Sequence, residues 1–166
     1  RCTSLTSLDF ASFDTSNVMS MHSMFQDCSS LTGLDLSGFD TSSVTSMYIM
    51  FYGCESLTHL NLTSFDTSKV TNMNFMFSGC SRLTSLDLSN FDTSNVTTMI
   101  WMFGRCYDLT SLNLSVKAPV AGESPAPGSD YCKIDGLPPY MKLERVDWLK
   151  CYDDWRYYSD KPFTFQ

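Results

Sequence analysis

The hydrophobic positions of this chain recur with a period of 26 residues. Each copy has the same order of residues: Cys, Leu, Leu, Leu or Phe, Phe, Val, Met, Met and Phe. The copies begin at Cys2, Cys28, Cys54, Cys80 and Cys106, and the last one stops matching after Ser115. A period of this length is typical of proteins built from stacked coils, because one coil cannot bury its apolar face alone.

The first half of each copy predicts a short strand. Leu31, Leu34 and Leu36 form the L-x-x-L-x-L pattern of a leucine-rich repeat. Leu34 and Leu36 are two residues apart, so a strand would turn both toward the same side. Stacked copies would then place these strands side by side in a parallel ladder.

The second half of each copy predicts a short helical segment. Val44, Met47, Met50 and Phe51 fall at positions i, i+3, i+6 and i+7, which is typical of one face of an α or 3-10 helix. We therefore expect an α/β repeat solenoid, a leucine-rich repeat with 26-residue coils. Its parallel strand ladder would occupy one face and its short helical segments the other.

Three regions are expected along the chain. Residues 1–116 would hold four full coils and one partial coil, and residues 117–130 form a Pro/Gly/Ser-rich loop. Residues 131–166 are rich in Tyr and Trp, and we expect them to form an irregular C-terminal cap over the last coil. Cys132 keeps the period, but the following KIDGLPPY fails the leucine pattern, so a cap is favoured over a sixth coil.

The spacing of the periodic cysteines predicts buried free thiols rather than disulfide bonds. Stacked side chains of the column from Cys2 to Cys106 would lie about 5 Å apart with parallel Cα–Cβ vectors. A disulfide needs a Cβ–Cβ distance of about 3.5–4.5 Å, so we expect buried free thiols. Cys132 and Cys151 are different, because a disulfide between them would close a loop around the cap in an oxidising compartment.

The repeat also resembles a known family. The string L-T-x-L-x-L-x-x-F-D-T-S-x-V-T-x-M-x-x-M-F, over residues 2 to about 115, resembles the BspA-like leucine-rich repeats of bacterial surface proteins. These repeats overlap the Mycoplasma-lipoprotein-associated repeat family. The resemblance implies a secreted or cell-surface protein that acts in adhesion, in binding host matrix proteins or in contact between microbes. It implies no catalytic residue.

Charge and composition exclude several classes of function. The chain carries 18 acidic and 11 basic residues, a formal charge of -7, which argues against nucleic acid as a partner. It has no apolar run of 18 residues, so we expect no membrane insertion. His22 and His59 have no Cys or Asp at ligand spacing, so we expect no metal site and no cofactor. Since the chain also has no recognisable catalytic motif, we expect that it is not an enzyme.

An acidic column follows the strand in each copy. It consists of Asp14, Asp40, Asp66 and Asp92. Four carboxylates at coil spacing are a candidate cation site. We favour the simpler interpretation that each Asp accepts N–H groups of its own turn, because Asp-Thr-Ser is a turn-forming sequence.

Polar residues also alternate with the buried leucines on the strand face. They form a weakly acidic surface with cross-strand hydrogen bonds, and ligand binding there is the alternative. The candidates are Asp9, Asp35, His59, Asn61, Asp87 and Asn113.

The most variable positions lie between the two Met residues of each copy. They hold Tyr48 and Ile49, then Phe75, then Ile100 and Trp101, so the second position becomes larger toward the C-terminus. An exposed apolar patch of this kind usually marks a contact. We favour the interpretation that the chain's own aromatic cap covers this patch. The alternatives are that a partner protein binds there or that the exposure is incidental.

These features together predict an extracellular protein, secreted or held on a bacterial surface. Its function would be protein–protein binding or adhesion to host or other cells, with a host matrix or cell-surface protein as partner. A structural stalk that projects another domain is the first alternative, and carbohydrate binding is the second. The sequence indicates neither the identity of the partner nor the oligomeric state.

Overall fold

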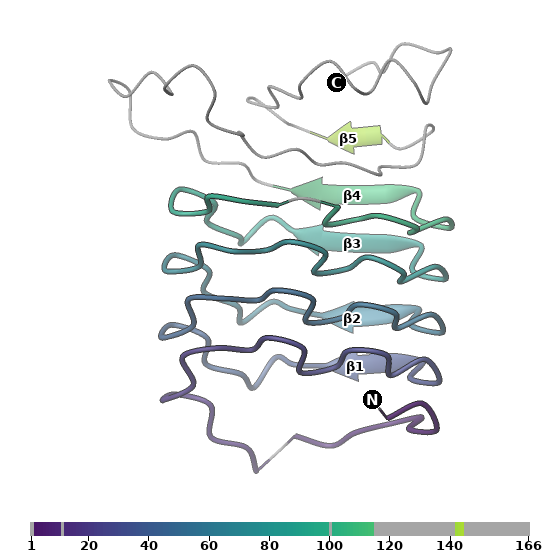
Figure 1. The fold of residues 1–166 in the computed structure, drawn as a ribbon, viewed down its shortest axis with the longest axis horizontal. Helices are drawn as coiled ribbons and strands as arrows, with labels where there is room; N and C mark the ends of the chain where they lie inside the picture. Colours follow the sequence, from purple (N-terminus) through teal and green to yellow (C-terminus); the bar gives the residue numbers. More distant parts are fainter. Residues whose placement is uncertain (1, 11, 100, 115–141, 145–166) are drawn as a thin grey trace.

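The computed structural model describes residues 2–10, 12–99, 101–114 and 142–144. In these residues the 26-residue copies stack one on another (Figure 1). We number the coils 1 to 5, and they span residues 2–27, 28–53, 54–79, 80–105 and 106–114. The strands are β1 (Gly33–Asp35), β2 (His59–Asn61), β3 (Ser85–Leu88), β4 (Ser111–Leu114) and β5 (Lys142–Glu144).

The strands of neighbouring coils pair in parallel and in register. Leu34 of β1 lies opposite Leu60 of β2, and Leu86 of β3 lies opposite Leu112 of β4. The predicted adjacency of equivalent leucines is therefore confirmed within both pairs. Among the described residues β2 and β3 do not pair, so the strand side consists of two small sheets.

The side of the stack away from the strands has a continuous ladder. Isolated parallel bridges join Ser20 to Ser46, Ser46 to Asn72, and Asn72 to Thr98. Each step again spans 26 residues. The four complete coils are therefore connected without interruption along this side.

The expectation of an α/β solenoid with helical segments is wrong. The part of the chain that the structure describes contains no helix, and the residues from Val44 to Gly53 form bridges and turns. Alternate N–H groups donate to the next coil at 2.8 to 3.0 Å. The donor–acceptor pairs are Met47–Asn72, Ile49–Asn74, Phe51–Met76 and Gly53–Ser78.

The remaining amides of this segment close tight turns. The N–H of Met50 donates to the carbonyl of Met47, and Tyr52 and Cys54 likewise reach the third residue back, each at 3.2 Å. An isolated helix of two turns is unstable in water, whereas stacking gives every second amide a partner in the next coil. The apolar spacing fits this arrangement as well as it fits a helix.

Aromatic rings fill the core in one stacked column. The rings of Phe25, Phe51, Phe77 and Phe103 lie nearly parallel, with successive centroids 5.5, 5.5 and 5.7 Å apart. These rings are almost completely buried. A repeat whose copies present the same ring at the same position therefore packs like on like along the whole stack.

The predicted free thiols are confirmed at the buried positions. Cys28, Cys54, Cys80 and Cys106 are free and buried. The Sγ atoms of Cys54, Cys80 and Cys106 donate to the carbonyls of Phe25, Phe51 and Phe77, each 29 residues earlier, at 3.1 to 3.3 Å. Burial raises the pKa of the Cys54 and Cys106 thiols to about 12. Cys2 is free but exposed at the N-terminal end of the stack, so the prediction of burial is wrong there.

The C-terminal region contributes one strand to the described structure. β5 lies within the predicted cap and pairs in parallel with β4, with Leu112 opposite Leu143. The predicted loop at 117–130 and the remainder of the cap lie outside the described residues. The candidate disulfide between Cys132 and Cys151 lies there too.

Candidate functional site

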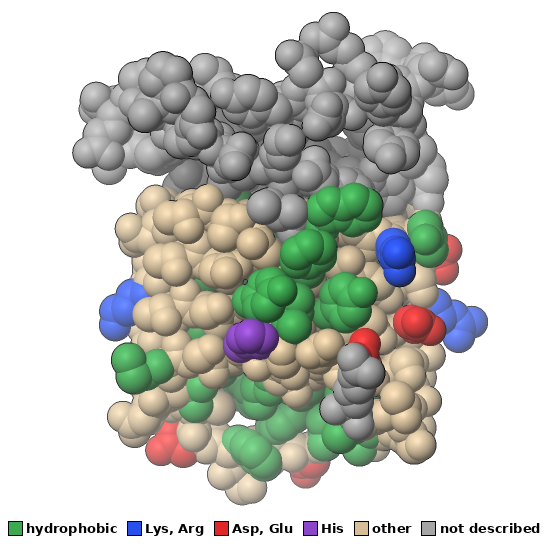
Figure 2. Space-filling view, viewed as in Figure 1, with side chains coloured by type: hydrophobic (Ala, Val, Ile, Leu, Met, Phe, Trp, Pro, Cys, Tyr) green, Lys and Arg blue, Asp and Glu red, His purple; other side chains and the backbone are tan. Residues whose placement is uncertain are grey.

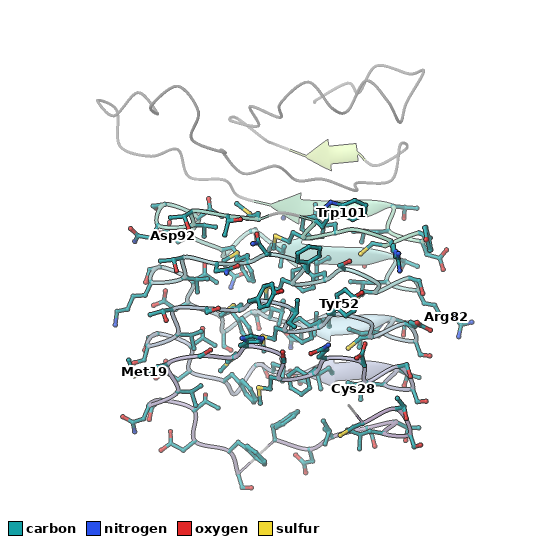
Figure 3. The ribbon with its side chains drawn as sticks, in the orientation of Figure 1. Met19, Cys28, Tyr52, Arg82, Asp92 and Trp101 are labelled. Carbon is teal, nitrogen blue, oxygen red and sulfur yellow. The ribbon has the colours of Figure 1, made fainter. Side chains whose placement is uncertain are left out.

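Three bulky apolar residues occupy the same position in successive coils. Ile49, Phe75 and Trp101, which we call the apolar column, each follow by three residues the bridged positions Ser46, Asn72 and Thr98 on the side away from the strands. Hydrophobic side chains gather on this face (Figure 2). Trp101 is 43% exposed, and the other two are half-buried. Figure 3 shows Trp101 among the coils nearest β4.

Aromatic contacts run along the same face beside the apolar column. The rings of His22 and Tyr48 meet edge to face with centroids 4.8 Å apart, and Tyr48 meets Phe75 in the same way at 6.3 Å. The structure therefore brings Tyr48 and Phe75 together, with Ile49 and Trp101 at the positions equivalent to Phe75 in the neighbouring coils. Ile100, the fifth candidate, lies outside the described residues.

The backbone of the apolar column is left-handed. The φ angles are 48° at Ile49, 55° at Phe75 and 53° at Trp101. This conformation costs an L-amino acid about 1–2 kcal/mol, and a β-branched residue such as Ile49 adopts it very rarely. The turns of the repeat impose the conformation, but they do not require a bulky side chain.

A second left-handed position in each coil provides an internal comparison. It is occupied by glycine in two of the four copies, at Gly53 with φ 70° and Gly79 with φ 83°. Glycine adopts these angles without a steric penalty. The other two copies hold Asp27 and Arg105 there, with φ 56° and 59°. In coils 2 and 3 the chain therefore uses the low-cost residue at one left-handed position and keeps Ile49 and Phe75 at the other.

Gly104 makes room for the indole of Trp101. A Cβ atom on Gly104 would lie only 2.5 Å from Cε3 of Trp101. The equivalent positions in earlier coils hold Gln26, Tyr52 and Ser78, so this glycine is not demanded by the repeat. Trp101, the largest side chain of the apolar column, and Gly104, which leaves space beside it, therefore belong to the same coil.

The strand face carries hydrogen-bonded polar residues. Asn61 Nδ2 donates to Asp35 Oδ1 at 3.0 Å, and the backbone N–H of Ser37 donates to the same oxygen at 3.0 Å. Hydrogen bonds from the Ser37 backbone, then from its side chain, lower the pKa of Asp35. Asp87 accepts the N–H of Ser89 in the same way, at 2.9 Å.

A depression of about 590 Å³ opens on the strand face across β1, β2 and β3. Asp35, His59, Asn61 and Asp87 line it, so the structure brings together four of the six strand-face candidates. The other two, Asp9 and Asn113, do not line it. Leu60 forms an apolar part of the wall.

The Asp column closes turns, as the simpler interpretation predicted. Asp14, Asp40, Asp66 and Asp92 each accept the backbone N–H of the serine two residues later, at 2.9 to 3.0 Å. Within the described part of the chain, no group of three or more His, Cys, Asp or Glu residues is placed to hold a metal ion.

A buried threonine column was missed from the sequence. Thr41 Oγ1 donates to the carbonyl of Asp66 at 2.9 Å and accepts the N–H of Asp66 at 2.8 Å. Thr15 and Thr67 bond the next coil in the same manner. The signal was present, because Thr occupies this position in all four copies, directly after the Asp.

Comparison with known proteins identifies a family for the repeat region. Residues 1–116 match the model of a family described as "Mycoplasma protein of unknown function, DUF285". No curated protein and no solved structure matches the chain. Among the described residues, no helix has the length and apolar character needed to cross a bilayer.

Proposed function

The chain belongs to the DUF285 family of Mycoplasma proteins of unknown function, and we propose that this member is a protein-binding module. The apolar column, with Tyr48 beside it, is the proposed contact surface. The function is binding without catalysis.

One observation carries the proposal. Ile49, Phe75 and Trp101 hold bulky apolar side chains in left-handed backbone, where Gly or Asn would stabilise the fold more. Strained residues that remain partly exposed are typical of functional surfaces, because folding alone gives no reason to keep them.

The chemistry of the surface favours a protein partner. Trp and Tyr are enriched among the residues that dominate protein–protein binding energy, since they bury a large area and lose little rotamer entropy. The column extends over three coils, so one partner can contact several copies of the repeat at once.

The resemblance to BspA-like repeats supports a finer proposal. We place the protein outside the cell, secreted or on the surface, where its partner is a host matrix or cell-surface protein. The stalk alternative predicts uniform outer positions. The step from Ser23 to Ile49, Phe75 and Trp101 is not uniform, and this favours a binder.

Surface plasmon resonance against fibronectin, fibrinogen, laminin and collagen tests the proposal. We expect one of them to bind the immobilised chain and the double variant Phe75→Asn/Trp101→Asn to weaken it at least about tenfold. Asn tolerates left-handed backbone, so the variant keeps the turns. The matched control is Asp9→Ser/Asn113→Ser on the strand face, outside the depression, which should bind like the parent.

Two results would contradict the proposal. Absence of binding to all four proteins supports the stalk. A double variant that loses much of its thermal stability shows instead that the apolar column packs against another part of its own chain.

A further inference from the structure

The strand ladder is interrupted between coils 3 and 4. The N–H of Thr58 donates to the carbonyl of Thr32 at 2.9 Å, and Thr110 donates to Thr84 at 3.0 Å. Among the described residues, the corresponding bond from Thr84 to Thr58 is absent. This backbone hydrogen bond is therefore present between coils 2 and 3 and between coils 4 and 5, but not between coils 3 and 4.

A second missing bond marks the same place. The N–H of Leu36 donates to the carbonyl of Asn61 at 3.1 Å, but within the described part of the chain Leu62 makes no such bond to Asp87. Backbone donors and acceptors consequently remain available for a ligand along the edges of β2 and β3.

The interruption reaches the edge of the core. Leu34, Leu86 and Leu112 are 5%, 4% and 2% exposed, whereas Leu60, at the same position in coil 3, is only partly buried. The depression therefore combines open backbone groups with one accessible aliphatic side chain.

The polar side chains beside the interrupted step differ in length. In coil 3, Ser64 Oγ donates to the carbonyls of Leu36 and Phe39 at 3.0 and 2.9 Å. In coil 4 the same position holds Asn90, whose longer amide donates to Leu62 and Phe65 at 3.1 and 2.8 Å. A longer side chain thus makes the equivalent bonds next to the opening.

We propose that this depression is a binding site for a neutral or amino sugar. Its volume lies within the range of small-molecule sites. Asp35 and Asp87 offer carboxylate oxygens that pair with hydroxyls, and Asn61 offers the second N–H of an amide whose first N–H donates to Asp35. Leu60 can take the C–H face of a sugar ring. The two carboxylates disfavour an acidic sugar by like-charge repulsion.

An extended peptide fits the depression less well. A peptide that adds to a sheet needs an edge that faces outward along several residues. Here the edges of β2 and β3 face each other, and these strands have three and four residues. A sugar ring that lies between β2 and β3 can contact the edges of both strands, whereas an added peptide strand would pair with only one of them.

NMR titration of the 15N-labelled 166-residue chain tests this site. The probes are triacetylchitotriose, glucosamine and sialyllactose, added separately. We expect saturable shifts of the His59, Leu60 and Ser85 amides with the first two sugars and none with the acidic one. The exposed side chain of His59 lines the depression, so His59→Ala should weaken binding about tenfold without unfolding the chain.

The matched control is Asp40→Ala, which removes a turn carboxylate outside the depression and should leave sugar binding unchanged. The proposal fails if no probe shifts these amides. It also fails if shifts concentrate at the apolar column, if Asp40→Ala weakens binding as much as His59→Ala does, or if a short peptide shifts these amides while the sugars do not. None of these outcomes bears on protein binding by the apolar column, which is tested separately.

Discussion

At the scale of single residues, a buried hydroxyl links each coil to the next. Thr67 is completely buried, and its Oγ1 both donates to the carbonyl and accepts the N–H of Asp92, at 2.9 and 2.8 Å. Valine has nearly the same shape and lacks these bonds. Because the site is dry, loss of the hydroxyl cannot be compensated by water.

We expect Thr67→Val to lower the free energy of unfolding by about 2 kcal/mol, because two buried backbone groups lose their shared partner. Thr67→Ser keeps the hydroxyl and should cost clearly less. Urea unfolding followed by circular dichroism measures both variants. Equal losses for Val and Ser would show that the hydroxyl contributes only volume.

The Asp column makes stability depend on pH. Hydrogen bonds from Ser16, Ser42 and Ser68, their side chains first, lower the pKa of Asp14, Asp40 and Asp66 below the ordinary value of 3.8. A lowered folded-state pKa stabilises the folded chain fully above the unfolded value and loses this effect as pH falls through the folded value. The stabilisation should therefore be lost progressively as the pH falls below 3.8 toward the lowered pKa of the folded chain.

The triple variant Asp14→Asn/Asp40→Asn/Asp66→Asn tests this dependence. Asn still accepts the turn N–H but does not titrate, so the variant should lose less stability than the parent as the solution is acidified below about pH 4. Melting temperatures from about pH 6 to about pH 2.5 measure the difference. Parallel curves for the parent and the variant would exclude these carboxylates as the cause.

At the scale of elements, the turn that carries the apolar column holds conformational strain. Ile49 is a β-branched residue at φ 48°. We expect Ile49→Asn to leave the free energy of unfolding unchanged or raise it by up to about 1 kcal/mol, since Asn adopts left-handed backbone more easily. Val44→Asn, at a fully buried position of the same coil, should unfold the protein or nearly do so.

Chemical denaturation of these two variants gives the comparison. A loss of more than about 1 kcal/mol for Ile49→Asn would mean that the side chain packs for stability, and the argument for a binding surface would lose its main support.

The sequence predicted the strands better than the segment between them. Alternation at Leu34 and Leu36 identifies a strand because no other element places those residues on one side. The spacing from Val44 to Phe51 is compatible with a helix and with successive turns. The decision depended on hydrogen bonds to a neighbouring coil, and these cannot be read from one copy of the repeat.

The candidate sites were predictable to different degrees. The apolar column was visible as a departure from the repeat at Phe75 and Trp101, although its left-handed backbone was not. The depression was not visible, because the leucine pattern is the same on both sides of the open step. Only Asn90, a longer residue where Ser64 stands in the previous coil, marks that step in the sequence.

At the scale of the whole molecule, position in the stack decides what a residue contributes. Phe13 is 55% exposed in coil 1, whereas its equivalent Phe39 in coil 2 is 2% exposed. We expect Phe39→Ala to lower the free energy of unfolding by about 3–5 kcal/mol and Phe13→Ala to lower it by less than half as much. Thermal or urea unfolding measures both variants. Equal losses in the free energy of unfolding would contradict a stack in which Phe13 lies at the end and Phe39 in the interior.

The stacking of equivalent positions, with turns in place of helices, underlies both proposed surfaces. A NOESY spectrum of the isotopically labelled chain tests it most directly. We predict cross-peaks between backbone protons of residues 26 apart, as from Ser46 to Asn72 and from Leu34 to Leu60. A continuous series of helical i to i+3 cross-peaks from Val44 to Phe51, without the 26-residue contacts, would contradict the account.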